Sequence, residues 1–590
     1  MESSARSQST QPYRPQPSIE HSYRPDLQTE SSLASALVRH LAELGVERAF
    51  GVIGGAIGVL FDALEESVIE THHFRHETGA AFAATEAYFA SGKPTLVFTT
   101  TGPGMLNALT GITAARWEGA KVILVSGSTS APQRGRWATQ ESSSYTLPQD
   151  ALFGRGPIFD YALRMESPSE LPEVIRRLAL GLARPGGFVA HLGLPISLQS
   201  SRVEAPKVPC RARLSSPAVA PEDVEHCAEL LQEDEDLVVW LGFGARGSAP
   251  AIRALVERTN ARVMSSPRGK GIFPEDHPNY LGVTGLGGHQ EVLEQLRERR
   301  PRWILVLGSR LGEATSFWDR DLTPAEGFIH VDLDPEVPGV AFPDCRTYGI
   351  QAEIGGFLEA LLPRLPERED NVTPLPVRHA AGLELPCCQD PVRPQALMEA
   401  IQRRVVQGSD ALVMAECGNA FAWCSHYLRF PKPGRYRVST LYGSMGHCAA
   451  GVVGAALTRG KTVAVVGDGS MLMNSEISTA VQYHAPAVWV VLNDGGYGMC
   501  ESGQEVLGLA TGQLAFPEVD FVKLARAMGA DGIQVRSEDM LDVALEKALV
   551  ASGPYVLDVR IDASQISPLM HRFESLLKQG SSKNVAGWEV

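Results

Sequence analysis

The sequence lacks a long hydrophobic run, a regular cysteine pattern and an excess of basic residues. No stretch of about 18 uninterrupted apolar residues occurs in the chain, so we expect no membrane-spanning helix and no membrane partner. The nine cysteines form no CxxC pair, which favours reduced thiols in a cytoplasmic protein over a disulfide framework or a zinc site. The net charge of −15 argues against a nucleic-acid partner, because nucleic-acid binding needs a basic patch.

The length of the chain and its pattern of apolar runs indicate several domains. A chain of 590 residues is too long for one hydrophobic core. Short apolar runs that end in glycine-rich turns alternate with stretches of helical periodicity, which is typical of parallel sheets covered by helices. We therefore expect an α/β protein with three consecutive doubly wound parallel-sheet domains. The predicted order is a disordered leader at 1–28, domains at 29–200, 215–365 and 390–565, and a C-terminal tail at 566–590.

Two glycine-rich turns follow neighbouring strands of the third predicted domain. One apolar run leads into residues 467–470 (GDGS), and the next leads into residues 493–496 (NDGG). Because the carboxyl ends of parallel strands meet at one edge of a sheet, Asp468 and Asp494 can face one cation. Such turns expose backbone N–H groups that suit a phosphate, and Mg²⁺ prefers oxygen ligands that it shares with phosphates. Each motif alone is often no more than a turn, but the pair favours a metal–phosphate site.

The segment GDGSMLMNSEISTAVQYHAPAVWVVLND resembles the signature of thiamine-diphosphate-dependent enzymes of the acetolactate synthase and 2-oxo acid decarboxylase superfamily. The resemblance covers residues 30–565 and implies a pyrimidine-binding, a central and a diphosphate-binding domain, in that order. It implies that Asp468, Asp494 and the carbonyl oxygen of Gly496 bind Mg²⁺, although the family has asparagine where Asp494 stands. It also implies an active site shared between two chains, and hence a homodimer or homotetramer.

The same resemblance indicates which residues would hold the cofactor. Met445 would lie beneath the thiazolium ring and enforce the bent shape of thiamine diphosphate, since a large and flexible apolar side chain suits that place. On its own, a methionine here would more often be plain core. The other predicted cofactor-binding residues are Gly418, Asn419, Gly443, Gly467, Gly469, Ser470, Asn493, Tyr497, Gly498 and Met499.

The first domain carries the predicted activating carboxylate. Residues 74–81 (FRHETGAA) resemble the acetolactate synthase segment whose glutamate hydrogen-bonds the cofactor's pyrimidine ring, which lets the cofactor's own amino group take the C2 proton. Burial raises a carboxylate pKa and suits Glu77 to share that proton. The alternative is a surface glutamate favoured by the helix dipole. The further predicted catalytic residues are His76, Gln140 and Gly55 of the turn GVIGGAIG.

The positions that select the substrate depart from those of acetolactate synthases. Gly503 stands where the family has tryptophan, and Ala314 replaces the second arginine of a pair that begins at Arg310. The lost bulk favours a 2-oxo acid larger than pyruvate. We therefore expect a carboligase that decarboxylates a 2-oxo acid and couples it to a second carbonyl compound, giving an acyloin. The alternatives are a 2-oxo acid decarboxylase or C–C lyase, and a catalytically silent, cofactor-binding regulatory homologue.

A second glycine pattern lies in the central domain. Gly242, Gly244 and Gly247 follow an apolar run and match a dinucleotide fingerprint, but no acidic residue stands convincingly at the required distance. Related central domains bind FAD, bind ADP or bind neither, so FAD is one of three alternatives. A nicotinamide dehydrogenase built on this pattern would leave the GDGS and RHE segments without a role.

Overall fold

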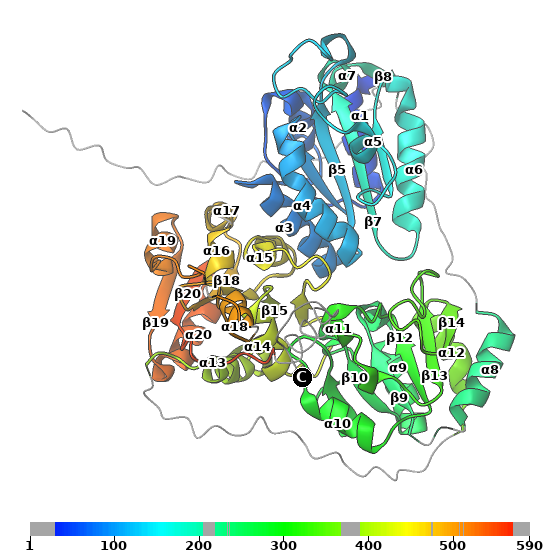
Figure 1. The fold of residues 1–590 in the computed structure, drawn as a ribbon. Coiled ribbons are helices and arrows are strands. Elements are labelled where there is room, and N and C mark those ends of the chain that lie inside the picture. Colours follow the sequence, from blue (N-terminus) through cyan, green and yellow to red (C-terminus); the bar gives the residue numbers. More distant parts are fainter. Residues whose placement is uncertain are drawn as a thin grey trace, which may run out of the picture.

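The computed structural model describes residues 30–204, 219–232, 234, 236–366, 390–473, 476–506, 508–510 and 512–569. They form three α/β domains in chain order, each built on a six-stranded sheet whose neighbouring strands all run parallel (Figure 1). The predicted fold class is therefore confirmed. The predicted leader lies outside the described residues.

The first domain is doubly wound, because helices cover both faces of its sheet. Leu96 and Val97 are successive residues of β4, and their side chains enter different cores. One core packs on α1 (Leu33–Glu43), α2 (Gly58–Glu65) and α6 (Leu171–Ala183), and the other on α3 (Glu77–Ser91), α4 (Pro103–Glu118) and α5 (Gln149–Phe153). The strand order is β3 (Glu70–His73), β2 (Arg48–Gly51), β4 (Thr95–Thr99), β5 (Lys121–Ser128), β7 (Phe188–Pro195) and β6 (Tyr161–Arg164).

A short antiparallel ribbon closes this domain. β1 (Glu30–Ser32) pairs with β8 (Arg202–Glu204), which follows α7 (Ile196–Gln199). The first domain thus continues to Glu204, beyond the predicted boundary at residue 200. A strand of only three residues carries too little periodicity to be recognised from sequence.

The central domain repeats this architecture. α8 (Pro221–Gln232), α9 (Ala249–Thr259) and α12 (Ile354–Leu361) pack on one face of its sheet, α10 (Gln290–Glu298) packs on the other, and α11 (Glu313–Ser316) follows β12. The strand order is β11 (Tyr280–Val283), β10 (Arg262–Ser265), β9 (Val238–Leu241), β12 (Trp303–Leu307), β13 (Gly327–Asp332) and β14 (Thr347–Gln351).

The third domain holds the two glycine-rich turns. α13 (Pro394–Ile401), α14 (Asn419–Tyr427) and α20 (Leu541–Val550) cover one face of its sheet, and α15 (His447–Arg459), α16 (Asp468–Leu472), α17 (Ile477–Gln482) and α19 (Phe521–Ala527) contribute to the core on the other. α18 (Gly498–Val506) follows β18. The strand order is β16 (Tyr436–Val438), β15 (Leu412–Ala415), β17 (Thr462–Gly467), β18 (Ala487–Asn493), β20 (Tyr555–Arg560) and β19 (Asp531–Val535).

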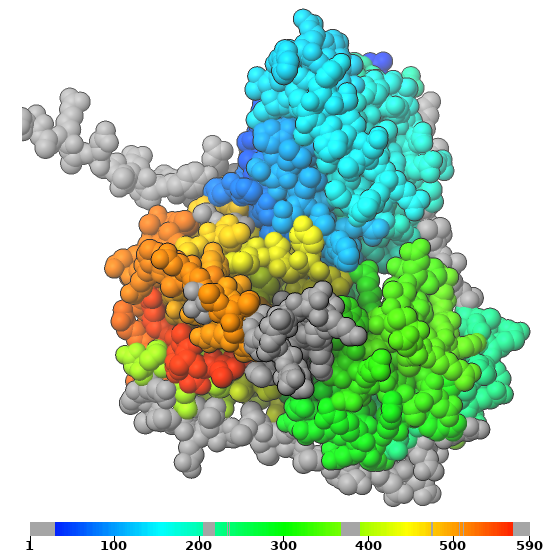
Figure 2. Space-filling model, in the orientation of Figure 1, coloured from blue at the N-terminus to red at the C-terminus, as the bar shows by residue number. Residues whose placement is uncertain are grey.

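The first and third domains share one hydrophobic core through α3 and α15. The two helices approach so closely that a Cβ atom on Gly454 would lie 2.1 Å from the carbonyl oxygen of Ala83. Glu86 of α3 accepts two hydrogen bonds from Arg437, at 2.9 and 2.6 Å, and pairs with His447 of α15 at 2.9 Å. Figure 2 shows the first domain, coloured blue to cyan, in contact with the yellow part of the third domain. The core and this buried ion pair therefore fix one domain against the other.

None of the helices in the described parts of the chain has the length and apolar character that a membrane crossing requires.

Candidate cofactor and metal site

A cavity of about 430 Å³ lies at the carboxyl edge of the third sheet. The loops that line it follow β15, β16, β17 and β18, which are neighbours in the sheet. All the predicted cofactor-binding and metal-binding residues line this cavity except Asn493. Those that do are Gly418, Asn419, Gly443, Met445, Gly467, Asp468, Gly469, Ser470, Asp494, Gly496, Tyr497, Gly498 and Met499.

Burial and a neighbouring negative charge make the ionised form of the cavity's two aspartates less favourable. Asp468 is 1% exposed, and its carboxylate accepts backbone hydrogen bonds from Gly469 and Gly495, both at 2.7 Å. Burial raises the pKa of Asp468. Burial, together with the neighbouring charge of Asp468, raises the pKa of Asp494 to about 7. A cation between the two carboxylates would relieve this repulsion.

The donor set fits a Mg²⁺ ion that is shared with a diphosphate. Within the described residues no group of three or more His, Cys, Asp and Glu side chains is placed to hold a metal ion by itself. An ion held by Asp468, Asp494 and the carbonyl oxygen of Gly496 would therefore complete its shell with phosphate oxygens and water, as Mg²⁺ commonly does. Gly469 lets the Tyr497 ring pack close to this turn, since a Cβ atom there would lie 2.8 Å from the ring.

Asn493 has a different position from the one expected. Its side chain is 4% exposed and donates hydrogen bonds to the Asp558 carboxylate at 2.7 Å and to the Val519 carbonyl oxygen at 3.1 Å. These bonds hold the end of β18 against β20 and leave the side chain turned to protein groups. A partner 65 residues away along the chain could not be recognised from the sequence motif.

The predicted catalytic residues gather at the corresponding edge of the first sheet. Gly55, His76 and Gln140 follow the ends of β2, β3 and β5 and are exposed. Glu77, the first residue of α3, is 8% exposed and accepts a hydrogen bond from the Asn107 amide at 3.1 Å. His76 caps α3, with its Nδ1 accepting the N–H of Thr78.

A single chain does not bring these two sets of residues together. The cavity beside Asp468 is lined by residues of the central and third domains, and none of the described residues 30–204 lines it. Glu77 therefore lies outside the cavity of its own chain.

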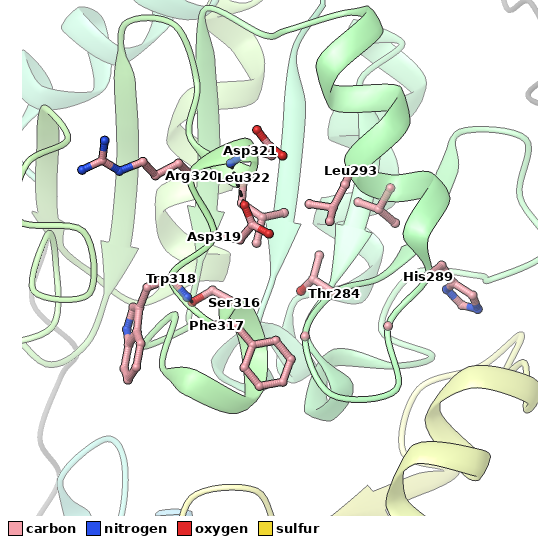
Figure 3. A pocket seen from close by; sticks show the side chains of 13 residues that line it. Thr284, His289, Leu293, Ser316, Phe317, Trp318, Asp319, Arg320, Asp321 and Leu322 are labelled. Carbon is pink, nitrogen blue, oxygen red and sulfur yellow. Dashed lines mark hydrogen bonds between the residues drawn. The ribbon is translucent and has the colours of Figure 1, made fainter. Parts of the chain in front are cut away.

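The central domain forms a wall of the cavity that sequence reasoning identified only at Ala314. The residues of this wall are Leu286, Gly312, Glu313, Ala314, Thr315 and Phe317. Phe317 adopts a left-handed backbone conformation, with φ of 47°. It also lines a second cavity, of about 470 Å³, at whose lower edge it appears in Figure 3. Gly503, the other predicted substrate position, lies in α18 and does not line the cofactor cavity.

Several backbone N–H groups in the glycine-rich loop of the central domain are used within the fold. The N–H of Gly242 donates to the Leu307 carbonyl oxygen and that of Gly244 to the Gly308 carbonyl oxygen, both at 2.9 Å. The N–H of Ala245 turns back to Gly242. The fingerprint places the N-terminus of an α-helix at this turn, whereas here the short 3-10 helix η4 (Phe243–Gly247) forms the turn and α9 begins at Ala249.

Phe243, which lies in this loop, is in contact with side chains from all three domains. Phe243 packs edge-on against Phe89 of the first domain, with 5.4 Å between the ring centroids. The guanidinium of Arg268 lies 4.1 Å from the centroid of the Phe243 ring, and that of Arg437, from the third domain, lies 5.2 Å from it. The loop therefore lies at an interface between the three domains, and its contacts are less suited to a turn that binds flavin.

Comparison with known proteins defines the class. The family models for thiamine pyrophosphate enzymes match along the chain: the N-terminal TPP binding domain at residues 31–147, the central domain at 224–361 and the C-terminal TPP binding domain at 416–559. The chain belongs to the thiamine pyrophosphate enzyme family.

Relatives narrow this class. A putative acetolactate synthase large subunit of Mycobacterium tuberculosis is 30% identical over 83% of this chain and 90% of its own length. A probable acetolactate synthase large subunit of Methanocaldococcus jannaschii is 28% identical over 91% and 93%. A solved structure of a putative thiamin diphosphate-dependent enzyme from Mycobacterium smegmatis superposes with a TM-score of 0.77, covering 90% of this chain and 99% of its own, and its 23% identity supports the fold alone. The protein is a thiamine-diphosphate-dependent, acetolactate synthase-like enzyme.

Proposed function

We propose that the protein is a Mg²⁺-dependent carboligase, which decarboxylates a 2-oxo acid bulkier than pyruvate and joins the product to a second carbonyl compound. The observation that carries this proposal is the pair of carboxylates, the buried Asp468 and the half-buried Asp494, that share one cavity at the ends of two neighbouring strands. Thiamine diphosphate supplies the electron sink for such chemistry. Asp468, Asp494 and the Gly496 carbonyl oxygen would hold the ion that anchors it.

The remaining residues of the chain would position the cofactor and move a proton. Met445 lines the cavity beside Gly469, where a Cβ atom would lie 3.4 Å from the Met445 Cε, and would support the bent cofactor. Glu77 would hold a proton at the pyrimidine ring, since a carboxylate with little exposure to water is suited to share one.

The lining of the cavity favours an apolar substrate. Of the described residues that line it, none is Lys, Arg or His, whereas Glu313 adds a third carboxylate. Ala314 leaves space on the wall that the central domain contributes. A second substrate with its own carboxylate would find no cationic side chain in this half of the site. We therefore favour an aldehyde as the acceptor, and a bulky, apolar 2-oxo acid as the donor.

We infer that the active form is a homodimer or a homotetramer. The cavity of one chain lacks Glu77, so a second chain would supply it. The edge of the first domain that carries Glu77 and Gln140 also exposes large apolar side chains, which supports its burial against a partner. The exposed fractions are 94% for Trp137, 82% for Tyr145 and 46% for Ile53.

We also propose that the central domain works without flavin. The N–H groups of Gly242 and Gly244 are used within the fold, and Phe243 lies under Arg268. The purified protein should show no flavin absorbance, and added FAD should leave its melting temperature unchanged. A yellow protein, or a rise in melting temperature with FAD, would contradict this part of the proposal.

A product panel tests the carboligase. The protein is mixed with Mg²⁺, thiamine diphosphate, 2-oxo acids of increasing size and an aromatic aldehyde, and CO₂ and acyloin are measured separately. We expect both products, with turnover favouring acids larger than pyruvate. Release of CO₂ with aldehyde as the only product would indicate the decarboxylase instead. Cofactor binding without any CO₂ would indicate the silent homologue.

The variant Glu77→Gln tests the activating role in the same assay. We expect turnover to fall by about 10²–10⁴-fold, with cofactor affinity retained. The matched control is Glu66→Gln, which changes an exposed glutamate at the end of α2.

A further inference from the structure

The loop that precedes Glu77 is bound by the third domain of its own chain. The N–H of His76 donates to Glu476 at 3.1 Å, and the N–H of Arg75 donates to the same carboxylate at 3.2 and 3.3 Å. The N–H of His73 donates to the Tyr483 hydroxyl at 2.6 Å. Two backbone N–H groups of this loop and that of His73, the last residue of β3, are thus fixed by side chains at the two ends of α17.

The side chain of Arg75 adds a second layer of contact with the same helix. Its Nε donates to the Ser478 hydroxyl at 3.0 Å, and its Nη2 donates to the Gln482 side chain at 2.7 Å. These bonds are exposed to solvent. They should therefore contribute less to the position of the loop than the bonds from the backbone N–H groups to Glu476.

Glu476 is a buried carboxylate that accepts hydrogen bonds from the loop before Glu77. It is 1% exposed, and its carboxylate accepts from the two backbone N–H groups and from the Thr479 hydroxyl. Burial raises its pKa to about 6. Burying a carboxylate is unfavourable unless its hydrogen bonds are satisfied, and here they are satisfied by the peptide groups directly before Glu77.

Glu476 also lies close in sequence to the metal loop. Glu476 directly precedes α17, and the helix before it in the chain, α16, begins at Asp468. The bonds of Glu476 therefore connect the segment that follows Asp468 to the segment that carries Glu77. Since Glu77 does not line the cavity of its own chain, it would serve the cavity of a partner while being held by its own third domain.

We propose that Glu476 is a positioning residue, which fixes the backbone of Arg75 and His76 so that Glu77 meets the cofactor in the partner's cavity. This inference rests on the proposed function. In such a site, a shift of about 1 Å in a catalytic group slows the chemical step by up to about 10²-fold. Changing Glu476 should thus impair cofactor activation while leaving cofactor binding intact.

The direct readout is the exchange of the cofactor's C2 proton for deuterium, followed by NMR on the full-length protein with Mg²⁺ and thiamine diphosphate bound. We expect Glu476→Gln to slow this exchange by about 10–100-fold with unchanged affinity for cofactor and metal. The matched control, Ser478→Ala, removes only an exposed side-chain contact of Arg75 and should stay within about twofold of the wild type. A role confined to fold stability would move the melting temperature but not the exchange rate of the folded protein.

The outcomes separate this inference from the proposed function. Wild-type exchange in Glu77→Gln would overturn the proposed role of Glu77 itself. Slow exchange in Glu77→Gln, together with wild-type exchange in a folded Glu476→Gln, would overturn only the positioning role. If Glu476→Gln fails to fold, Glu476→Asp keeps the charge but withdraws the carboxylate from the N–H groups of Arg75 and His76, and it should also slow exchange. Wild-type exchange in that variant would overturn the inference.

Discussion

The aspartate at position 494 would give the proposed metal site a pH dependence that an asparagine would not have. Burial and the charge of Asp468 raise the pKa of Asp494 to about 7. A metal ion needs the carboxylate unprotonated, so protons compete with Mg²⁺ below this pKa. Protonation of Asp494 is favoured as the pH falls through 7, so metal affinity rises as the pH rises through 7. The competition weakens apparent Mg²⁺ affinity by about tenfold between pH 8 and pH 6.

The substitution Asp494→Asn isolates this effect. Calorimetric titration of Mg²⁺ is carried out with saturating thiamine diphosphate from pH 6 to pH 8. Because the cofactor's phosphate also titrates, the informative quantity is the ratio of wild-type to variant affinity at each pH. We expect this ratio to fall by about tenfold from pH 8 to pH 6, and wild-type affinity to exceed that of the variant at pH 8, where the variant lacks one negative charge.

The control for this experiment is Glu501→Gln, which removes a charge that also raises the pKa of Asp494 but by less than that of Asp468. It should shift the midpoint only slightly and keep the slope. A ratio that stays constant across the pH range would refute the reasoning, because Asp494 would then either not bind the metal or not have a raised pKa.

Two further substitutions test the wall of the cavity and the junction of the domains. Phe317→Ala should join the cavities of about 430 and 470 Å³. The ratio of kcat/KM for a bulky acceptor to that for a small acceptor should then rise by roughly tenfold. Trp318→Ala, which alters only the second of these cavities, should leave that ratio unchanged. Glu86→Gln should lower the free energy of unfolding in urea by about 3–5 kcal/mol, because it leaves Arg437 buried beside an uncharged partner. Breaking the exposed Arg253–Glu257 pair with Glu257→Gln should change it by at most about 0.5 kcal/mol.

The sequence allowed the prediction of those parts of the site that are local along the chain. Asp468 and Asp494 each directly follow a buried apolar strand, and the parallel order of such strands places their ends at one edge. Glu77 was predicted from the resemblance of residues 74–81 to the acetolactate synthase segment, which is also local along the chain. The glycine pattern at Gly242 shows the limit of this reasoning, because the partners of its N–H groups come from the next strand of the sheet and could not be foreseen.

The unpredicted parts depend on contacts between distant segments. Glu476 gained its role from peptide groups 400 residues away, and Asn493 is directed away from the cavity by Asp558. The wall at Phe317 comes from another domain and from a left-handed backbone that a bulky residue rarely adopts. Such features arise from the packing of three sheets against one another, which leaves no periodic signal in the sequence.

The central claim is that Asp468 of one chain and Glu77 of another complete one thiamine-diphosphate site. Coexpression of Glu77→Gln and Asp468→Ala chains tests it, since each variant alone should be nearly inactive. Random pairing gives intact sites, with Glu77 from one chain and Asp468 from the other, in about a quarter of cases. We therefore predict about a quarter of wild-type turnover in the coexpressed protein. Turnover no higher than that of the separate variants, in a protein shown to contain mixed oligomers, would contradict the account.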